Sequence, residues 1–215
     1  MTRTALIVGA SRGLGRAIAT DLAARGWNVI GTVRGSETID GITVEHLDVT
    51  EPAQLAPLRD RLPELDLLFV NAGTTTREDT PIGEVSTEEF VRVMVTNSLS
   101  PLRVIDALAE RVVPDGLIGV MSSGQGSITN NTKGLREVYR GSKAALNMFM
   151  RSYAARQPER ALVIIAPGWI RTELGGPEAP FTIEENVPKV VDVLESRLGK
   201  AGLEYLDYSG ATVPW

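Results

Sequence analysis

The sequence lacks cysteine altogether and contains a single histidine, His46. Without cysteine the chain can form no disulfide, no thiol nucleophile and no cysteine-ligated metal site. One histidine excludes a multi-histidine zinc site, and any Ser-His-Asp triad would have to use His46. We therefore expect no metal centre, and the lack of cysteine is compatible with a reducing compartment.

Basic runs and long apolar runs are missing as well. The 215 residues carry a formal net charge of −5, from 22 Lys and Arg against 27 Asp and Glu, with no basic tail. This balance argues against nucleic acid or an anionic membrane surface as the main partner. The first apolar run, residues 5–8, is far too short for a signal peptide or a membrane span. We expect a cytoplasmic protein.

What the chain has instead is a regular alternation of apolar strands and amphipathic helices. Strands are predicted at residues 4–8, 27–33, 42–47, 65–70, 117–121, 161–166 and 203–206. Continuous apolar strands separated by helices indicate an α/β fold, a doubly wound parallel seven-stranded sheet with helices on both faces. No linker or repeat divides the chain, so we expect one domain over residues 1–215.

Capping patterns predict where several helices begin. Residues 14–25 form the first helix, and Thr50 caps a second with Pro52 in its first turn. The capping box that begins at Ser86 opens a long helix, which is kinked at Pro101 and runs to about Val113. Two further helices are predicted, one ending near residue 156 and one capped at residue 182.

Residues 9–15, G-A-S-R-G-L-G, follow the first strand and open the first helix. Gly9 permits a tight turn, Gly13 lets the backbone approach a pyrophosphate, and Gly15 lets the helix pack close to the sheet. The helix N-terminus offers free N–H groups and its positive dipole end to phosphates. A glycine-rich turn without a ligand is the alternative, but the strand-turn-helix context favours a dinucleotide.

The residues after the second and third strands bear on the choice of cofactor. An acid after the second strand would favour NAD, but this position holds Arg34, which can pair with a 2′-phosphate while Arg12 assists from the glycine turn. The alternative is two solvated surface arginines. We expect NADP(H), with NAD(H) as the second choice. Asp48 is either an acceptor for the adenine amino group or a helix cap.

Tyr139 and Lys143 lie one turn apart on a predicted helix, so they share a face. A nearby ammonium favours the phenolate and lowers the pKa of the phenol, which suits a general acid or base. Ser122 and Ser123 follow the fifth strand, where a hydroxyl could stabilise a developing alkoxide. Asn97 is mid-helix, where it either bends the helix and holds a water or marks an irregularity caused by Pro101.

Together these segments resemble the short-chain dehydrogenase/reductase family over essentially the whole chain. The glycine motif has Val8 where the family has threonine, and N-A-G at 71–73, Y-x-x-x-K at 139–143 and P-G-x-I-x-T at 167–172 follow in family order. The resemblance implies four catalytic residues: Asn97, Ser123, Tyr139 and Lys143. It implies a larger cofactor-binding set: Gly9, Ser11, Arg12, Gly13, Leu14, Gly15, Arg34, Asp48, Val49, Asn71, Ala72, Gly73, Tyr139, Lys143, Pro167, Gly168, Ile170 and Thr172.

The resemblance also implies a mechanism. Hydride passes from the reduced nicotinamide to a carbonyl carbon, Tyr139 protonates the alkoxide, and Ser123 positions the carbonyl oxygen. Lys143 lowers the pKa of Tyr139 and holds the nicotinamide ribose, and Asn97 supports a water that relays protons to Lys143. The expected substrate is an aldehyde or ketone, or the corresponding alcohol in reverse, in contact with three residues: Gln125, Ile128 and Trp169.

Loop lengths refine the resemblance. Residues 126–134 and 211–215 look similar to the C-factor-like and carbonyl-reductase-like subgroup, and the short segment 173–181 suggests an open or shallow substrate pocket. Relatives often associate through two long helices, here about 88–113 and 140–156, which favours a homodimer or homotetramer. Relatives with an enlarged loop before the catalytic tyrosine are monomers, so a monomer is the alternative. Two other function classes compete. One is a dinucleotide-binding sensor or signalling protein with little turnover; the other is a hydrolase using Ser123, which lacks a G-x-S-x-G elbow.

Overall fold

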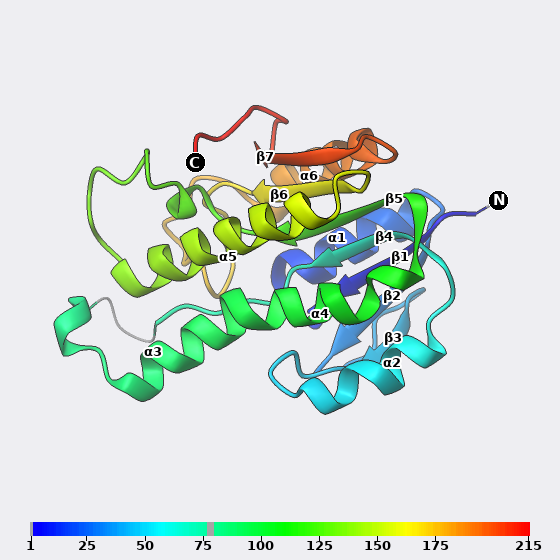
Figure 1. Ribbon diagram of the computed structural model, residues 1–215, viewed down its shortest axis with the longest axis horizontal. Coiled ribbons are helices and arrows are strands. Elements are labelled where there is room, and N and C mark those ends of the chain that lie inside the picture. The colour runs from blue at the N-terminus through cyan, green and yellow to red at the C-terminus, as the bar shows by residue number, and fades with distance from the viewer. Residues whose placement is uncertain (1, 77–79) are drawn as a thin grey trace.

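The computed structural model describes residues 2–76 and 80–215. Seven parallel strands form one sheet in the order β3-β2-β1-β4-β5-β6-β7 (Figure 1). They are β1 (Thr4–Val8), β2 (Asn28–Val33), β3 (Thr43–His46), β4 (Leu65–Val70), β5 (Val112–Met121), β6 (Ala161–Ala166) and β7 (Gly202–Asp207). The strand order reverses between β1 and β4, which confirms the predicted doubly wound sheet.

Helices cover both faces of this sheet. On one face lie α1 (Gly13–Ala24) and α6 (Ile183–Arg197); on the other lie α2 (Leu55–Arg61), α4 (Ser100–Leu108) and α5 (Glu137–Arg156) (Figure 1). Strand β1 shows why the strands are apolar throughout. Leu6 and Val8 pack into the core on the α5 side, while Ala5 and Ile7 pack into the core on the α1 side. Successive side chains point to opposite faces and both are buried, so no polar alternation develops.

Two of the predicted helix starts are confirmed. The Ser86 hydroxyl accepts a hydrogen bond from the Glu89 N–H at 3.2 Å and begins α3 (Thr87–Met94). Thr182 and Glu185 form a complete, reciprocal capping box at the start of α6. Each cap satisfies N–H groups that the first helical turn leaves unpaired, which stabilises a helix by about 1 kcal/mol.

The long helix predicted to reach Val113 is wrong in its last part. A π-helical segment, η3 (Val95–Leu99), follows α3 and leads into α4, after which a 3-10 turn, η4 (Ala109–Arg111), ends the helical stretch. Strand β5 already begins at Val112, which pairs with Leu65 before a shift in register. Val112 is β-branched, and Pro114 has no N–H for a helix, so both favour an extended chain.

Thr50 does not cap a helix, contrary to the prediction. Its N–H and hydroxyl both donate to Asp48 Oδ1, at 2.9 and 2.7 Å, which makes a side-chain-stabilised turn. A short 3-10 helix, η1 (Pro52–Gln54), begins after Glu51 and leads into α2. Pro52 occupies its first position as predicted. Among the described residues, no helix is both long enough and apolar enough to cross a membrane.

Candidate active site at the carboxyl edge of the sheet

The predicted site residues follow β1, β2, β3, β4, β5 and β6 or lie on η3 and the first turns of α5. All strands run parallel, so their carboxyl ends share one edge of the sheet. The fold therefore gathers segments that are up to about 160 residues apart in the chain, and such an edge is where doubly wound folds bind ligands.

The glycine turn is packed against the end of β4. Gly9 has φ +88°, and a Cβ built on it would lie 2.8 Å from the Ala72 backbone. A Cβ on Gly15 would lie 2.1 Å from the Gly9 carbonyl oxygen, so neither position tolerates a side chain. Asn71 braces the turn as predicted, because its side-chain amide donates to that same Gly9 oxygen at 3.2 Å. Leu14 lies in the first turn of α1, directly after Gly13.

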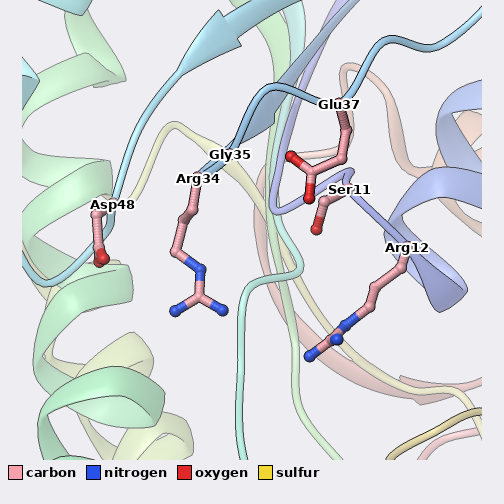
Figure 2. Close-up of a pocket in the computed structure, with 6 residues that line it drawn as sticks. All are labelled: Ser11, Arg12, Arg34, Gly35, Glu37 and Asp48. Atoms are coloured by element: carbon pink, nitrogen blue, oxygen red, sulfur yellow. The ribbon is translucent and has the colours of Figure 1, made fainter.

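A cavity of about 350 Å³ lies beside this turn, between the ends of β1, β2 and β3. Figure 2 shows Arg34 and Arg12 extending into the same space from different segments. Ser11 and Asp48 also line the cavity, as predicted for cofactor-binding residues. Two guanidinium groups facing one cavity form a site for a doubly charged phosphate, since each can offer paired N–H donors.

No sequence motif predicted the two carboxylates beside this cavity. Glu37 lines it three residues beyond Arg34, with its carboxylate near Ser11 (Figure 2). Glu173, in the loop after β6, forms a salt bridge with Arg12 at 2.8 Å. Arg12 occupies the N-cap position of α1 yet turns its side chain toward Glu173. Glu173 competes with an incoming phosphate for Arg12, and Glu37 adds negative charge to the cavity that the two arginines line.

Asp48 holds a turn rather than the end of a helix. Burial alone would raise the pKa of Asp48, but the two hydrogen bonds from Thr50 and the charges of Arg34 and His46 lower it below its ordinary value. The carboxylate is therefore anionic at neutral pH. Val49, the next residue, is buried in the core beside α2. The helix-cap role considered for Asp48 is therefore wrong, because its side chain bonds Thr50 in a turn, and the adenine contact stays a prediction.

Ser123 and Tyr139, the predicted reactive pair, lie together. Tyr139 is 7% exposed, and its neighbour Ser123 lowers the pKa of the phenol against the larger effect of burial. The Ser123 hydroxyl also accepts from the Gln125 N–H at 3.1 Å, which begins a short 3-10 turn, η5 (Gly124–Gly126). The choice of Ser123 over Ser122 agrees with this geometry, because the Ser122 hydroxyl is buried and donates to Asn147.

Lys143 lies one turn below Tyr139 and is 4% exposed. Its Nζ donates to the Met121 carbonyl oxygen at 2.9 Å and lies 5.9 Å from the centre of the Tyr139 ring. Burial lowers the pKa of Lys143 to about 8. The sequence predicts a lowered pKa for Tyr139, but burial raises it, against smaller lowering effects of the Ser123 hydrogen bond and the Arg136 charge. Desolvation therefore decides the direction in which the pKa of Tyr139 moves.

Asn97 is fully buried within the π-helical segment η3. Its side-chain oxygen accepts from the Thr74 N–H at 2.8 Å, and its amide nitrogen donates to the Thr74 carbonyl and to Ser142 Oγ. Pro101 has no N–H for the carbonyl four residues earlier, which is that of Asn97. Both explanations of the irregularity therefore have structural support, and the water that Asn97 is predicted to hold stays a prediction.

Gly73 lies next to both this asparagine and Lys143. A Cβ built on Gly73 would lie 3.4 Å from Asn97 Oδ1 and 3.5 Å from Lys143 Nζ. Three segments distant in sequence therefore converge around a glycine whose missing side chain leaves room for a ligand. The approach of a cofactor ribose to the N-A-G turn stays a prediction.

The loop after β6 folds back over the glycine turn. Gly168 has φ +88°, and Ile170 pairs with Phe181 in an isolated bridge. The Thr172 hydroxyl accepts from the Gly175 N–H at 2.9 Å, and its methyl group would lie 3.9 Å from a Cβ on Gly13. Pro167 is held from α6, because its carbonyl accepts from the buried Asn186 amide. The predicted carboxamide-binding segment thus lies directly across from the phosphate-binding turn.

The predicted substrate residues do not all lie together. Gln125 and Ile128 line a second cavity of about 290 Å³, between the loop after β5 and α5, with Glu137 and Arg140 among its other lining residues. Trp169 is outside that lining set; it is half exposed, and its indole N–H donates to the Gly175 carbonyl. Only two of the three residues therefore line this cavity, and the substrate contacts of all three stay predictions.

His46 lies far from Ser123. It is on β3, four strands from β5 in the sheet order, which is roughly 19 Å at the usual spacing between strands. Its ring nitrogen contacts the Arg34 carbonyl oxygen at 2.7 Å, so it steadies the arginine segment. A hydrolytic triad of Ser123 and His46 is excluded by this separation.

The comparisons with known proteins agree with the fold. A profile of the short chain dehydrogenase family matches residues 3–181. The chain belongs to the short-chain dehydrogenase family. A Burkholderia multivorans structure with bound NADP is 57% identical over 100% of both chains, with a TM-score of 0.97. These findings confirm the family that the motifs had indicated.

Two further relatives connect the chain to the subgroup expected from its loops. A carbonyl reductase from Pseudomonas aeruginosa PAO1, solved in complex with NADP, is 30% identical over 100% of both chains, with a TM-score of 0.92. The C-signal protein of Myxococcus xanthus is 34% identical over 155 residues, which are 70% of this chain and 93% of that protein. Short-chain dehydrogenases of the carbonyl-reductase and C-signal kind are therefore its relatives.

Proposed function

We propose that this short-chain dehydrogenase is an NADP(H)-dependent oxidoreductase that reduces an aldehyde or ketone to an alcohol. The observation that carries the proposal is that Ser123 lies beside the buried Tyr139 and Lys143, at the same sheet edge as two arginines that face one cavity. The first group is suited to proton transfer and the second to phosphate recognition. We treat residues 1–215 as one domain, since the sheet draws strands from 4 to 207.

The residues present fit a nicotinamide dinucleotide along this edge. Arg12 and Arg34 would hold the 2′-phosphate, and the start of α1 would hold the pyrophosphate. The open space beside Gly73 would receive the ribose next to Lys143 Nζ. NADP bound to the Burkholderia and Pseudomonas relatives supports the phosphate-bearing form over NAD(H).

The cofactor, when bound, supplies the hydride that is added to the carbonyl carbon. Tyr139 donates its phenolic proton to the developing alkoxide, and its raised pKa keeps this proton in place at neutral pH. Ser123 Oγ hydrogen-bonds the substrate oxygen and orients it. Lys143 carries positive charge at pH 7, which stabilises the phenolate left on Tyr139. Asn97 holds the Thr74 backbone beside this pair.

The test is a titration of the purified chain with NADPH and NADH, followed by NADPH consumption on small aldehydes and ketones. Tyr139→Phe should abolish turnover while NADPH binding is retained. Tyr153→Phe provides a matched control, because Tyr153 is also buried and lies four turns further along α5. Full activity of Tyr139→Phe would refute the assignment.

A sensor or signalling protein with little turnover is the second candidate, and the relation to the C-signal protein is the observation that favours it. The complete Ser123, Tyr139 and Lys143 set argues for chemistry instead, because a pure binding protein has no use for a buried, destabilised lysine. NADPH binding without turnover on any carbonyl would favour the sensor.

Assembly is proposed as a homodimer or homotetramer. Large apolar side chains are exposed on the outer sides of α3, η3 and α5: Phe90, Val91, Leu99, Met148 and Phe149. Water-exposed apolar groups on neighbouring helices favour self-association. Sedimentation of the wild-type chain and of Phe149→Glu would test it, with a shift to monomer expected. We also propose a cytoplasmic location, which fractionation of expressing cells would test.

A further inference from the structure

A tyrosine at the edge of the sheet contacts the reactive serine. Tyr205 on β7 is 1% exposed and is among the largest fully buried side chains. Its hydroxyl donates to the Ser123 carbonyl oxygen across 82 residues of sequence. A buried phenol needs a partner for its hydroxyl, and this one is directed at the reactive segment.

The Ser123 carbonyl lies just beyond the regular sheet. The last β5–β6 register pair is Met121 with Ile165, and the Ser122 N–H is the final ladder donor, to the Ile165 carbonyl. From Ser123 onward the sheet supplies no donor in the described structure. The Ser123 carbonyl oxygen instead accepts from two donors: the Gly126 N–H within the adjoining 3-10 turn, at 2.8 Å, and the Tyr205 hydroxyl, which ties this turn to β7.

The same segment is held from the other side by α5. Ser122 Oγ donates to Asn147 Oδ1 at 2.7 Å, and the Asn147 amide donates to the Gly126 carbonyl at 3.3 Å. Asn147 lies one turn beyond Lys143. Residues 122–126 are therefore held between β7 and the helix that carries Tyr139 and Lys143, so the distance between serine and tyrosine depends on both.

Tyr205 is itself held by the last residue of the sequence. The Trp215 ring packs 5.5 Å from the Tyr205 ring, and the Arg151 guanidinium lies 4.5 Å from the centre of the Trp215 ring. The Trp215 carbonyl oxygen accepts from the Thr129 N–H and hydroxyl, at 3.0 and 2.6 Å. These contacts restrict the phenol to one orientation.

We propose that Tyr205 is a positioning residue for carbonyl reduction, which fixes the backbone of Ser123 so that its hydroxyl meets the substrate oxygen beside Tyr139. The inference rests on the proposed function and adds a residue from outside the family motifs. Tyr205 touches neither substrate nor cofactor in this role; it acts through Ser123. Catalytic groups must be held to within a fraction of an ångström, so loss of one backbone restraint should slow the reaction.

The test compares Tyr205→Phe with Tyr153→Phe, two losses of a hydroxyl from the same core cluster. Tyr205→Phe should lower kcat for carbonyl reduction about 10-fold and raise KM for the carbonyl, since misplaced catalytic groups cost up to about 100-fold. NADPH affinity should stay within about twofold, because the restraint acts on Ser123 and not on the phosphate site. Tyr153→Phe should leave kcat unchanged.

A second readout is independent of turnover. The Gly124 amide nitrogen is bonded to the Ser123 carbonyl carbon, so its NMR shift reports the loss of the hydrogen bond. That shift should change in Tyr205→Phe and not in Tyr153→Phe. If Tyr205→Phe fails to fold, Trp215→Leu replaces it; this change loosens the phenol but keeps the hydroxyl, so a kcat loss of about threefold is expected.

Unchanged kcat in a folded Tyr205→Phe protein would overturn the inference, and so would equal losses in the two tyrosine variants. If Tyr205→Phe fails to fold, unchanged kcat in Trp215→Leu would overturn it equally. An inactive wild-type chain would refute the proposed function instead. In that case the Gly124 shift alone would decide whether Tyr205 positions Ser123, with no shift overturning it.

Discussion

The two ends of the proposed cofactor site differ in how far their polar groups are exposed to water. At the reactive end, Tyr139 and Lys143 are buried, and Ser122, Asn97 and Asn147 bind partners inside the protein. At the adenosine end, the charged groups are solvated: the side chains of the Arg12–Glu173 pair are 68% and 73% exposed. Burial makes single polar contacts strong at the first end, whereas water and salt weaken them at the second.

This difference predicts how each end responds to substitution. A change at the reactive end should alter rate or stability strongly and should depend little on salt. A change at the adenosine end should alter cofactor affinity moderately, and the effect should shrink as ionic strength rises.

The largest effect is expected for Tyr139→Phe. Removing the hydroxyl that is proposed to protonate the alkoxide should lower kcat by about 10² to 10⁴-fold, the usual contribution of a general acid. NADPH affinity should hardly change, because the phosphate site is untouched. Single-turnover reduction by the variant, measured beside that of Tyr153→Phe, checks this. A rate loss that depends strongly on salt would contradict the predicted difference between the two ends.

Lys143→Met should lower reductase activity and raise the free energy of unfolding. Burial lowers the pKa of Lys143 from 10.5 to about 8, which corresponds to about 3 kcal/mol of destabilisation at neutral pH. Between pH 8 and 10.5 the unfolded chain binds more protons than the folded chain, so wild-type stability rises with pH relative to the variant. Urea unfolding of the cofactor-free proteins from pH 6.5 to 10.5 measures the difference.

The methionine variant should be the more stable protein at pH 7, by less than 3 kcal/mol because Nζ also loses its bond to Met121. It should have little reductase activity. A stability difference that stays flat across this pH window would show that the lysine is solvated rather than buried.

Arg34→Ala should weaken NADPH binding by about 10 to 100-fold, as expected for losing a charge-assisted contact, and leave NADH binding nearly unchanged. Arg103→Ala, on the exposed side of α4, makes the same change in net charge and should leave the affinities for NADPH and NADH unchanged. Fluorescence titrations at low and high salt check both. Equal losses for the two cofactors would mean that Arg34 does not face the 2′-phosphate.

Glu37→Gln should have the smallest effect and the opposite sign. It removes a negative charge from the cavity that Arg34 and Arg12 line, so NADPH should bind about two- to fivefold more tightly at low salt. The gain should disappear at high salt. Glu64→Gln, an exposed residue before β4, is the control for net charge. Weaker NADPH binding would instead indicate that the Glu37 carboxylate contacts the cofactor itself.

Local patterns predicted much of the fold and part of the site. The apolar strands, the capping boxes at Ser86 and Thr182 and the glycine turn all follow from residues close together in sequence. The predicted end of the long helix near Val113 is wrong, because Val112 pairs with Leu65 of β4 and this pairing overrides the helical pattern. Parallel strands also dictate that residues after strand ends meet at one edge, so the family motifs could be placed together.

The sequence by itself thus determined the sheet and the glycine turn, and it predicted which residues react. Only the tertiary structure decided their environment. The i,i+4 spacing of Tyr139 and Lys143 predicts a lowered phenol pKa, yet burial raises it, and burial depends on every segment packed around the pair. Tyr205 reaches Ser123 from 82 residues away. Desolvation and contacts between distant strands have no local signature, because they arise only when the sheet brings those segments together.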